Sequence, residues 1–141
     1  MIDNFETLVN PMQPIPYFIQ TMTGITNEMV ADAPSFEEVA AQLFALLNDK
    51  VFIAHNVNFD YSFVMHQLSL AGFQWQAKKL CTVRYARKVI PGRSSYSLGN
   101  ICRDLGIDNK ARHRAAGDAL ATAALLEHLL RNDVDQQHLQ A

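Results

Sequence analysis

The sequence contains few cysteines and no long apolar run. Its two cysteines, Cys81 and Cys102, stand far apart and lack the paired spacing of zinc ligands, which excludes a disulfide-rich scaffold and a zinc finger. No apolar stretch approaches the roughly 20 residues that a membrane-spanning helix needs. The first residues show no basic stretch followed by an apolar one, so we expect no signal peptide, reduced thiols and a cytoplasmic location.

The sequence also lacks a P-loop, the glycine pattern of dinucleotide-binding folds, internal repeats and low-complexity segments. Its 141 residues are 49% apolar and 18% charged, which is typical of one soluble globular domain. A domain of this length can bury a core without disulfides or structural metals.

Charge is unevenly distributed along the chain. Ten of the 12 Lys and Arg residues lie within residues 78–114, beside only two acids, so this segment carries +8 and the remainder −10. Two tyrosines are interleaved with the cations: the set is Arg84, Tyr85, Arg87, Lys88, Arg93 and Tyr96. Such a segment could follow a phosphate backbone and stack bases. It could equally be an amphipathic helix with a solvated basic face.

Hydrophobic periodicity predicts strands that alternate with helices, and hence an α/β layer fold with parallel pairing at its centre. Strands are expected at residues 5–9, 51–54 and 80–83. Helices are expected at residues 17–22, 26–30, 35–48, 58–71, 97–106 and 115–131, with a basic helix that ends before Pro91. Ser35 followed by Glu38 is a capping-box pattern at a helix start. We expect a domain over residues 1–131 and a polar, frayed tail over residues 132–141.

The first segment with candidate catalytic or binding residues comprises residues 54–60, where a buried strand ends and a helix begins. Ligand sites in open α/β sheets lie at the carboxyl ends of strands, so His55, Asn56 and Asp60 are site candidates. A structural interpretation is also open. A carboxylate in a first helical turn interacts favourably with the helix dipole in any protein, and His55 and Asn56 could be ordinary loop residues.

The second segment comprises residues 113–119. His113 and Asp118 are five residues apart, about 140° around a helix, so they converge only if His113 lies in the preceding loop. Asp118 has mainly apolar neighbours at helical spacing, and a carboxylate on a core-facing stripe is costly unless it is paired or binds metal. Gly117 and the surrounding alanines leave room for a close approach.

Two carboxylates and a neutral histidine suit metal-assisted hydrolysis of a phosphodiester. Two divalent ions would stabilise the attacking water and the leaving oxygen, and the histidine would accept the water proton. Hard oxygen ligands favour Mg²⁺ or Mn²⁺ over zinc.

These two segments, in this order, resemble the second and third motifs of the DEDDh 3′→5′ exonucleases, which include the epsilon proofreading subunit of bacterial DNA polymerase III. The likeness covers residues 5–131. Additional matching positions are residues 5–11, Thr23, Gly24, Ile25, Thr26, Met29, Ala33, Pro34, Phe36, Phe59 and Ala119.

The resemblance implies a ribonuclease H-like fold, with a mixed sheet flanked by helices, and stepwise removal of nucleotides from the 3′ end of DNA or RNA. It implies that Asp60 and Asp118 are metal-site carboxylates and that His113 is the general base. The residues that would border the terminal nucleotide are Thr23, Gly24, Ile25, His55, Asn56 and Phe59. Expected partners are single-stranded 3′ ends and polymerase or other replication or repair subunits or domains, with no membrane.

The chain departs from this family at its start. The family's first strand carries Asp-x-Glu, which is absent here, and Asp3 and Glu6 would point to opposite faces of a strand. We expect one or two strands, roughly 15–25 residues, to be missing, which would leave unpaired edges on residues 5–9 and 51–54. Weak or absent activity is expected. The alternatives are a non-catalytic nucleic-acid-binding or interaction module derived from such a nuclease, or a generic α/β binding domain.

Overall fold

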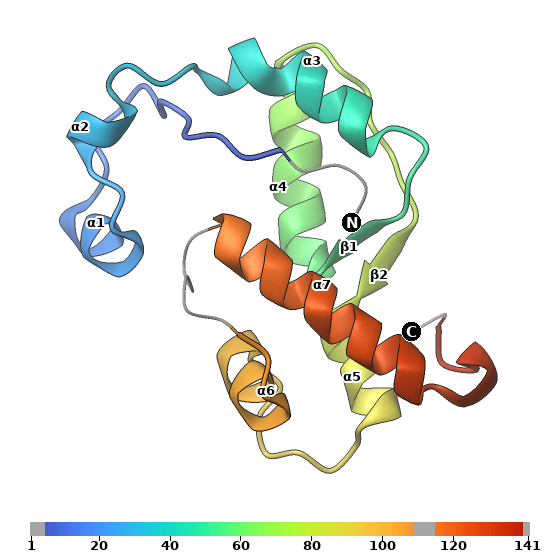
Figure 1. The fold of residues 1–141 in the computed structure, drawn as a ribbon. Coiled ribbons are helices and arrows are strands. Elements are labelled where there is room, and N and C mark those ends of the chain that lie inside the picture. Colours follow the sequence, from blue (N-terminus) through green and yellow to red (C-terminus); the bar gives the residue numbers. More distant parts are fainter. Residues whose placement is uncertain (1–4, 109–114, 140–141) are drawn as a thin grey trace.

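The computed structural model describes residues 5–108 and 115–139 (Figure 1). Seven α-helices, two strands and one 3₁₀ helix occur in these ranges. In chain order they are α1 (Tyr17–Thr23), α2 (Asn27–Val30), α3 (Phe36–Leu47), β1 (Phe52–Ala54), α4 (Val57–Leu70), β2 (Lys79–Cys81), α5 (Thr82–Val89), α6 (Leu98–Leu105), α7 (Ala115–Asn132) and η1 (Val134–Gln136). None of these helices has the length and apolarity to cross a membrane.

The two strands form a parallel pair, with Ala54 opposite Cys81 at their carboxyl ends. A parallel pair requires a crossover connection, and α4 supplies it. The predicted α/β class with parallel pairing is therefore confirmed, although the sheet has only two strands within the described residues.

Helices cover both faces of this sheet. Side chains alternate along a strand, so Ile53 and Leu80 pack on the face that carries α5 and α7. Phe52, which has the opposite orientation, packs with residues of α3 and α4. In Figure 1, α7 crosses in front of the strands with α5 and α6 below it. Among the described residues, two apolar clusters thus lie on the two faces of the sheet, and a third, smaller one of Val57, Cys81 and Val83 lies at the carboxyl ends of the strands.

The predicted helix starts are confirmed by their caps. Ser35 accepts a hydrogen bond from the Glu38 N–H, and the Glu38 carboxylate accepts one from the Ser35 N–H at 3.1 Å, which completes the capping box of α3. Ser97 caps α6 by accepting a bond from the N–H of Asn100. Thr26 caps α2 in the same way, so this helix begins one residue later than predicted.

The predicted strand at residues 5–9 is wrong. This segment is irregular, and its end makes only an isolated parallel bridge from Asn10 to Ser35. A strand needs a neighbour whose N–H and C=O groups complete its ladder, and no described residue provides one.

The expected burial of the strand at residues 51–54 is also wrong. Val51 is 54% exposed, and all three residues of β1 are half-buried. Within the described part of the chain β1 pairs only with β2, so its other edge has no partner strand there.

The expectation of a frayed tail after residue 131 is also wrong. Asp133 is 5% exposed and accepts a hydrogen bond of 2.7 Å from the hydroxyl of Tyr85, which is fully buried in α5. The N–H of His138 also donates to Asp133, and Leu139 packs against the core. A buried carboxylate needs such donors, so residues 133–139 fold back onto the domain.

Replacement of Tyr85 by Phe should destabilise the protein because it leaves the Asp133 carboxylate without its buried hydroxyl donor. Hydrogen bonds to charged groups contribute about 1.5–3 kcal/mol, and we expect a loss of that size in urea unfolding. Tyr61→Phe is the control, since its half-buried hydroxyl makes one bond to a neutral group, accepted from the N–H of Ala77 and worth about 1 kcal/mol. An equal loss in both variants would contradict this account.

The same contact predicts sensitivity to alkali. Burial, and then the Asp133 carboxylate, raise the pKa of Tyr85 to about 12, against about 10 in an unfolded chain. The folded state therefore holds this proton more tightly. Its contribution to stability is complete below about pH 10 and is lost between about pH 10 and 12. Unfolding free energies measured across this range should fall less in Tyr85→Phe than in the wild type.

Candidate functional site

The carboxyl ends of β1 and β2 lie side by side, and each strand leads directly into a helix. α4 begins after His55 and Asn56, and α5 begins at Thr82 immediately after β2. The two helix starts therefore meet at one edge of the sheet, the position at which α/β folds place ligands.

An open pocket of about 540 Å³ lies at this edge. One wall is the start of α4, with four of the predicted site residues: His55, Asn56, Phe59 and Asp60. The other wall comes from the end of β2 and from α5, with Cys81, Val83, Arg84 and Arg87. Four site candidates that are close in sequence thus share a cavity with residues about 25 positions further along the chain.

Asp60 lies in the first turn of α4 and is half-buried. Burial raises the pKa of this carboxyl above its ordinary value. None of the ion pairs between described residues involves Asp60. A bound cation at this position would offset the cost of burying the carboxylate.

His55 connects three parts of the chain. Its Nδ1 lies 2.7 Å from the hydroxyl of Thr82, and its Nε2 lies 2.6 Å from the carbonyl oxygen of Tyr96. Because a carbonyl can only accept, Nε2 carries the proton. Burial lowers the pKa of His55, which is partly opposed by the bond to Tyr96, so the neutral ring is favoured and Nδ1 accepts from Thr82. Both ring nitrogens are used within the protein.

Asn56 and Phe59 face the solvent at the pocket. Asn56 adopts a left-handed backbone with φ of 71°, a conformation that asparagine tolerates better than most residues, and it turns the chain from β1 into α4. The ring of Phe59 is 76% exposed. An exposed aromatic ring beside a carboxylate is a surface on which a base can stack.

Asp118 lies in the first turn of α7 and is half-buried. Ala121, Leu125 and Leu129 on the same stripe are buried, which confirms that Asp118 sits at the end of a core-facing stripe. Burial and then the charge of Asp118 raise the pKa of the buried Cys102 thiol. His113 lies outside the described residues, so its predicted convergence with Asp118 stays a prediction.

The small residues before and after Asp118 do leave open space. Ala115, Ala116 and Ala119 line a largely apolar pocket of about 580 Å³ whose other walls come from α3 and residues 5–9. The expected room for a close approach at this helix start is therefore present.

Thr23, Gly24 and Ile25 do not line the pocket that contains Asp60. Gly24 ends α1 in the left-handed conformation, with φ of 74°. Figure 1 shows α1 and α2 at the left edge of the molecule, separated from the start of α4. The structure thus brings together four of the predicted nucleotide-site and metal-site residues and leaves these three apart.

The described residues do not by themselves fit a two-ion metal site. Across residues 5–108 and 115–139, no three His, Cys, Asp or Glu side chains are placed so that they could share an ion. Asp60 and Asp118 have the right hard oxygen donors for Mg²⁺ or Mn²⁺, but they are too few for two divalent ions.

The basic segment separates into different roles in the structure. Tyr85 is fully buried and cannot stack on a base. Of the two tyrosines in the basic segment that could have stacked on bases, this one is therefore excluded. Arg93 forms an ion pair with Asp104. Arg84 and Arg87 are exposed and line the pocket. Their spacing of three residues places them on one face of an amphipathic helix, but it does not predict that this face borders the pocket.

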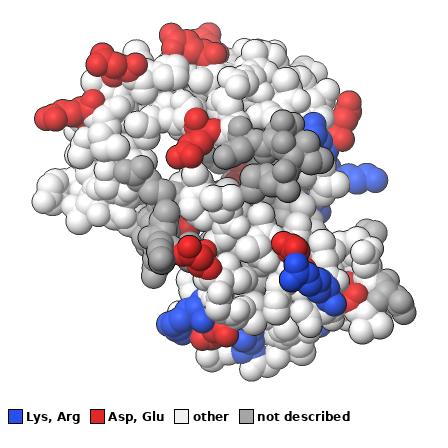
Figure 2. All heavy atoms as spheres, viewed as in Figure 1, with Lys and Arg blue, Asp and Glu red and all other residues white. Residues whose placement is uncertain are grey.

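Charge is also segregated on the surface. Figure 2 shows acidic side chains over the upper part of the molecule, near α2 and α3, and basic ones mainly at its lower end and right side. The sequence asymmetry between residues 78–114 and the rest therefore persists in space.

Cys81 was not anticipated as a pocket residue. Burial raises the pKa of its thiol, but the backbone N–H groups of Arg84, Val57, Asn56 and Val83 around the sulfur outweigh burial and lower it.

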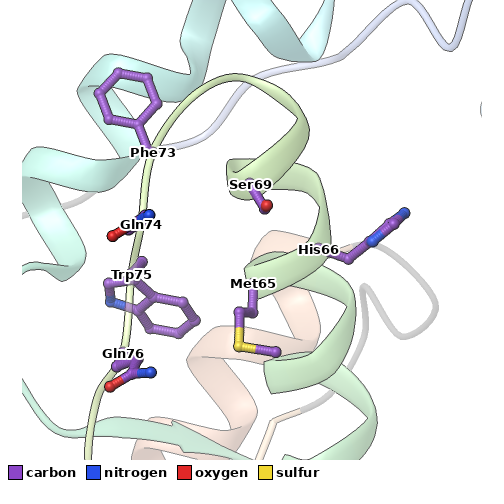
Figure 3. Close-up of a pocket in the computed structure, with 7 residues that line it drawn as sticks. All are labelled: Met65, His66, Ser69, Phe73, Gln74, Trp75 and Gln76. Carbon is purple, nitrogen blue, oxygen red and sulfur yellow. The ribbon is translucent and has the colours of Figure 1, made fainter.

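A second pocket, of about 650 Å³, lies between α4 and residues 73–76 (Figure 3). Its lining contains no carboxylate, and in Figure 3 the ring of His66 points away from Trp75 and Met65. The Trp75 indole N–H is buried without a hydrogen-bond partner. This pocket has no carboxylate and its one histidine points away from Trp75, so the pocket beside Asp60 is the better candidate site.

Comparison with known proteins identifies the family. A family model described as exonuclease, RNase_T, matches residues 1–126. The chain belongs to this exonuclease family. The DEDDh-type resemblance carried by residues 54–60 and 113–119 is thereby confirmed at the level of the family.

Relatives of the exonuclease family support the fold as well. The chain is 39% identical over 129 residues to the 3′-5′ exonuclease DinG of Bacillus subtilis, covering 91% of this chain and 14% of that protein. It is 36% identical to the DNA polymerase III subunit epsilon of Aquifex aeolicus, covering 91% and 64%. The chain thus spans less than two thirds of each of these curated relatives.

A solved structure, exonuclease X in complex with 5′ overhanging duplex DNA, matches with a TM-score of 0.70 and 28% identity, over 88% of this chain and 70% of that one. This match confirms the predicted ribonuclease H-like α/β fold.

The burial of His55 predicts a loss of stability in acid. Its pKa is lowered in the folded protein, whereas an unfolded histidine titrates near about 6.5. The unfolded chain therefore takes up the proton first, and stability falls as the pH drops below about 6.5. Urea unfolding at about pH 7 and about pH 5 should show a smaller difference for His55→Gln than for the wild type. His66→Gln, which removes an exposed histidine, is the control and should retain the wild-type difference.

Proposed function

We propose that this chain is a 3′→5′ exonuclease domain that acts on the 3′ end of DNA. The observation that carries the proposal is the pocket at the carboxyl ends of β1 and β2, where a half-buried Asp60 and an exposed Phe59 lie together in a chain of the exonuclease family. Phe59 would stack on the terminal base, and Asn56 and His55 would border the terminal nucleotide.

The proposed catalytic residues are Asp60, Asp118 and His113. Asp60 and Asp118 would contribute carboxylates to divalent ions, Mg²⁺ or Mn²⁺, which supply the electrostatic stabilisation in phosphodiester hydrolysis. His113 would accept the proton of the attacking water, a role that suits histidine because the ordinary pKa of this residue type lies near neutral pH. Thr23, Gly24 and Ile25 are assigned to the terminal nucleotide by the resemblance alone.

The shortage of oxygen ligands among the described residues supports low activity of this chain on its own. Two carboxylates offer too little negative charge for two divalent ions, and the open edge of β1 leaves that side of the site without a neighbouring strand. This shortage also favours a second candidate function, a non-catalytic nucleic-acid-binding module derived from such a nuclease.

We further propose partners and a location. The relatives include a subunit of DNA polymerase III and a DNA polymerase III of the PolC type, which supports association with a polymerase or another replication or repair protein. Both cysteines are buried and free, which supports the reducing environment of the cytoplasm and a proofreading or repair role there.

Degradation of a 5′-labelled single-stranded oligonucleotide by residues 1–141 tests the proposal. We expect a slow ladder of 3′-shortened products with Mg²⁺ or Mn²⁺ and none with EDTA. Asp118→Asn should abolish the ladder, and His113→Gln should slow it by roughly 100-fold or more. Asp32→Asn, which changes an exposed carboxylate in the loop between α2 and α3, is the matched control.

The two candidate functions give different results in this assay. Binding of the oligonucleotide without a ladder would favour the non-catalytic module. Neither binding nor degradation by a folded protein would refute both.

A further inference from the structure

The exposed face of α5 is positively charged and faces the pocket that contains Asp60. Thr82, Val83, Tyr85 and Ala86 are the buried residues of this helix. Arg84 and Arg87, three residues apart on the opposite side, are exposed and line the pocket. Side chains at this spacing start from neighbouring positions on a helix surface, so both arginines extend from the same face of α5.

These two cations are not neutralised by carboxylates of the described residues. The ion pairs in those ranges join Arg93 and Arg103 to Asp104, and Arg131 to Glu127. Arg87 has its guanidinium 5.6 Å from the centre of the Tyr96 ring, which orients the cation without using its N–H donors on a carboxylate. A positive site of this kind favours an anionic ligand.

The arginine side chains supply exposed donors on this side of the pocket. The residues that line the α5 wall are Cys81, Val83, Arg84 and Arg87, and the two arginines are the cations among them. A planar guanidinium can hold a phosphate through two hydrogen bonds.

We propose that Arg84 and Arg87 are positioning residues that hold two neighbouring phosphates of a single nucleic-acid strand whose 3′-terminal base lies against Phe59. This inference rests on the proposed function and adds to it the path of the strand, which runs from the α4 wall of the pocket along the exposed face of α5. The contacts are to phosphates, so they position the strand without reading its sequence. Arg84 and Arg87 thereby bring the terminal phosphodiester to Asp60.

The test is binding of a short fluorescein-labelled oligothymidylate, measured by fluorescence anisotropy in EDTA so that no strand is degraded. Each phosphate contact on a single strand contributes about 0.7 to the slope of log affinity against log salt. Replacement of both arginines by Gln should therefore lower the slope by about 1.4, and should weaken binding roughly tenfold at low salt. Both side chains are exposed, so the variant should stay folded, with a melting temperature lowered only by the loss of the Arg87 contact with the Tyr96 ring.

Two further variants separate position from net charge. Replacement of both arginines by Lys retains the charge and should restore the slope while recovering only part of the affinity, since Lys lacks the planar fork. The control for charge is Arg103→Gln, which removes an exposed cation on α6 that is outside the pocket and should leave the slope unchanged.

The outcomes distinguish this inference from the proposed function. A steep salt dependence that is unchanged in the Gln variant would overturn the role of Arg84 and Arg87 and leave the exonuclease proposal standing. A loss of about 0.7 in the slope of Arg103→Gln, as large as that expected for each pocket arginine, would also overturn it, because general charge would then explain the binding. Absence of any binding by the folded wild type would overturn both proposals.

Discussion

The parallel pairing of β1 and β2 is the contact on which the candidate site depends. It places Ala54 opposite Cys81, so both strands end at the same level and two helices begin next to each other. With only three residues in each strand, the backbone ladder is short. His55 reinforces it, since its ring joins the end of β1 to Thr82 at the start of α5 and to Tyr96 before α6. The pocket exists because these three segments are held together.

The same junction explains how opposite charges can share one pocket. Asp60 extends from α4, whereas Arg84 and Arg87 extend from α5, and no described ion pair joins them. A strand of nucleic acid offers phosphates to the arginines and, with divalent cations, to the carboxylate. The exposed ring of Phe59 lines the same pocket and suits a base. The charge pattern thus matches a ligand with anionic and aromatic parts.

Much of the candidate site could be predicted because it is local in sequence. His55, Asn56, Phe59 and Asp60 follow one another at a strand-to-helix junction, and such residues stay together once the two elements form. The contribution of α5 could not be predicted in the same way. Arg84 and Arg87 reach the pocket only because β2 pairs with β1, and that pairing is a long-range contact. The cluster of Lys and Arg residues in the sequence identified residues 78–114 as a candidate binding segment. It did not distinguish the pocket arginines from Arg93, which forms an ion pair with Asp104.

The sequence by itself determined the helix starts, the α/β class and the core-facing stripe of α7, because capping and hydrophobic periodicity act over a few residues. The tertiary structure alone decided which segments gained partners. Residues 5–9 have strand-like alternation but no ladder, because a strand forms only against a neighbour. Tyr85 is buried rather than exposed, and its hydroxyl donates a hydrogen bond to the buried carboxylate of Asp133. This pairing forms because a buried polar group is costly without a hydrogen-bond partner.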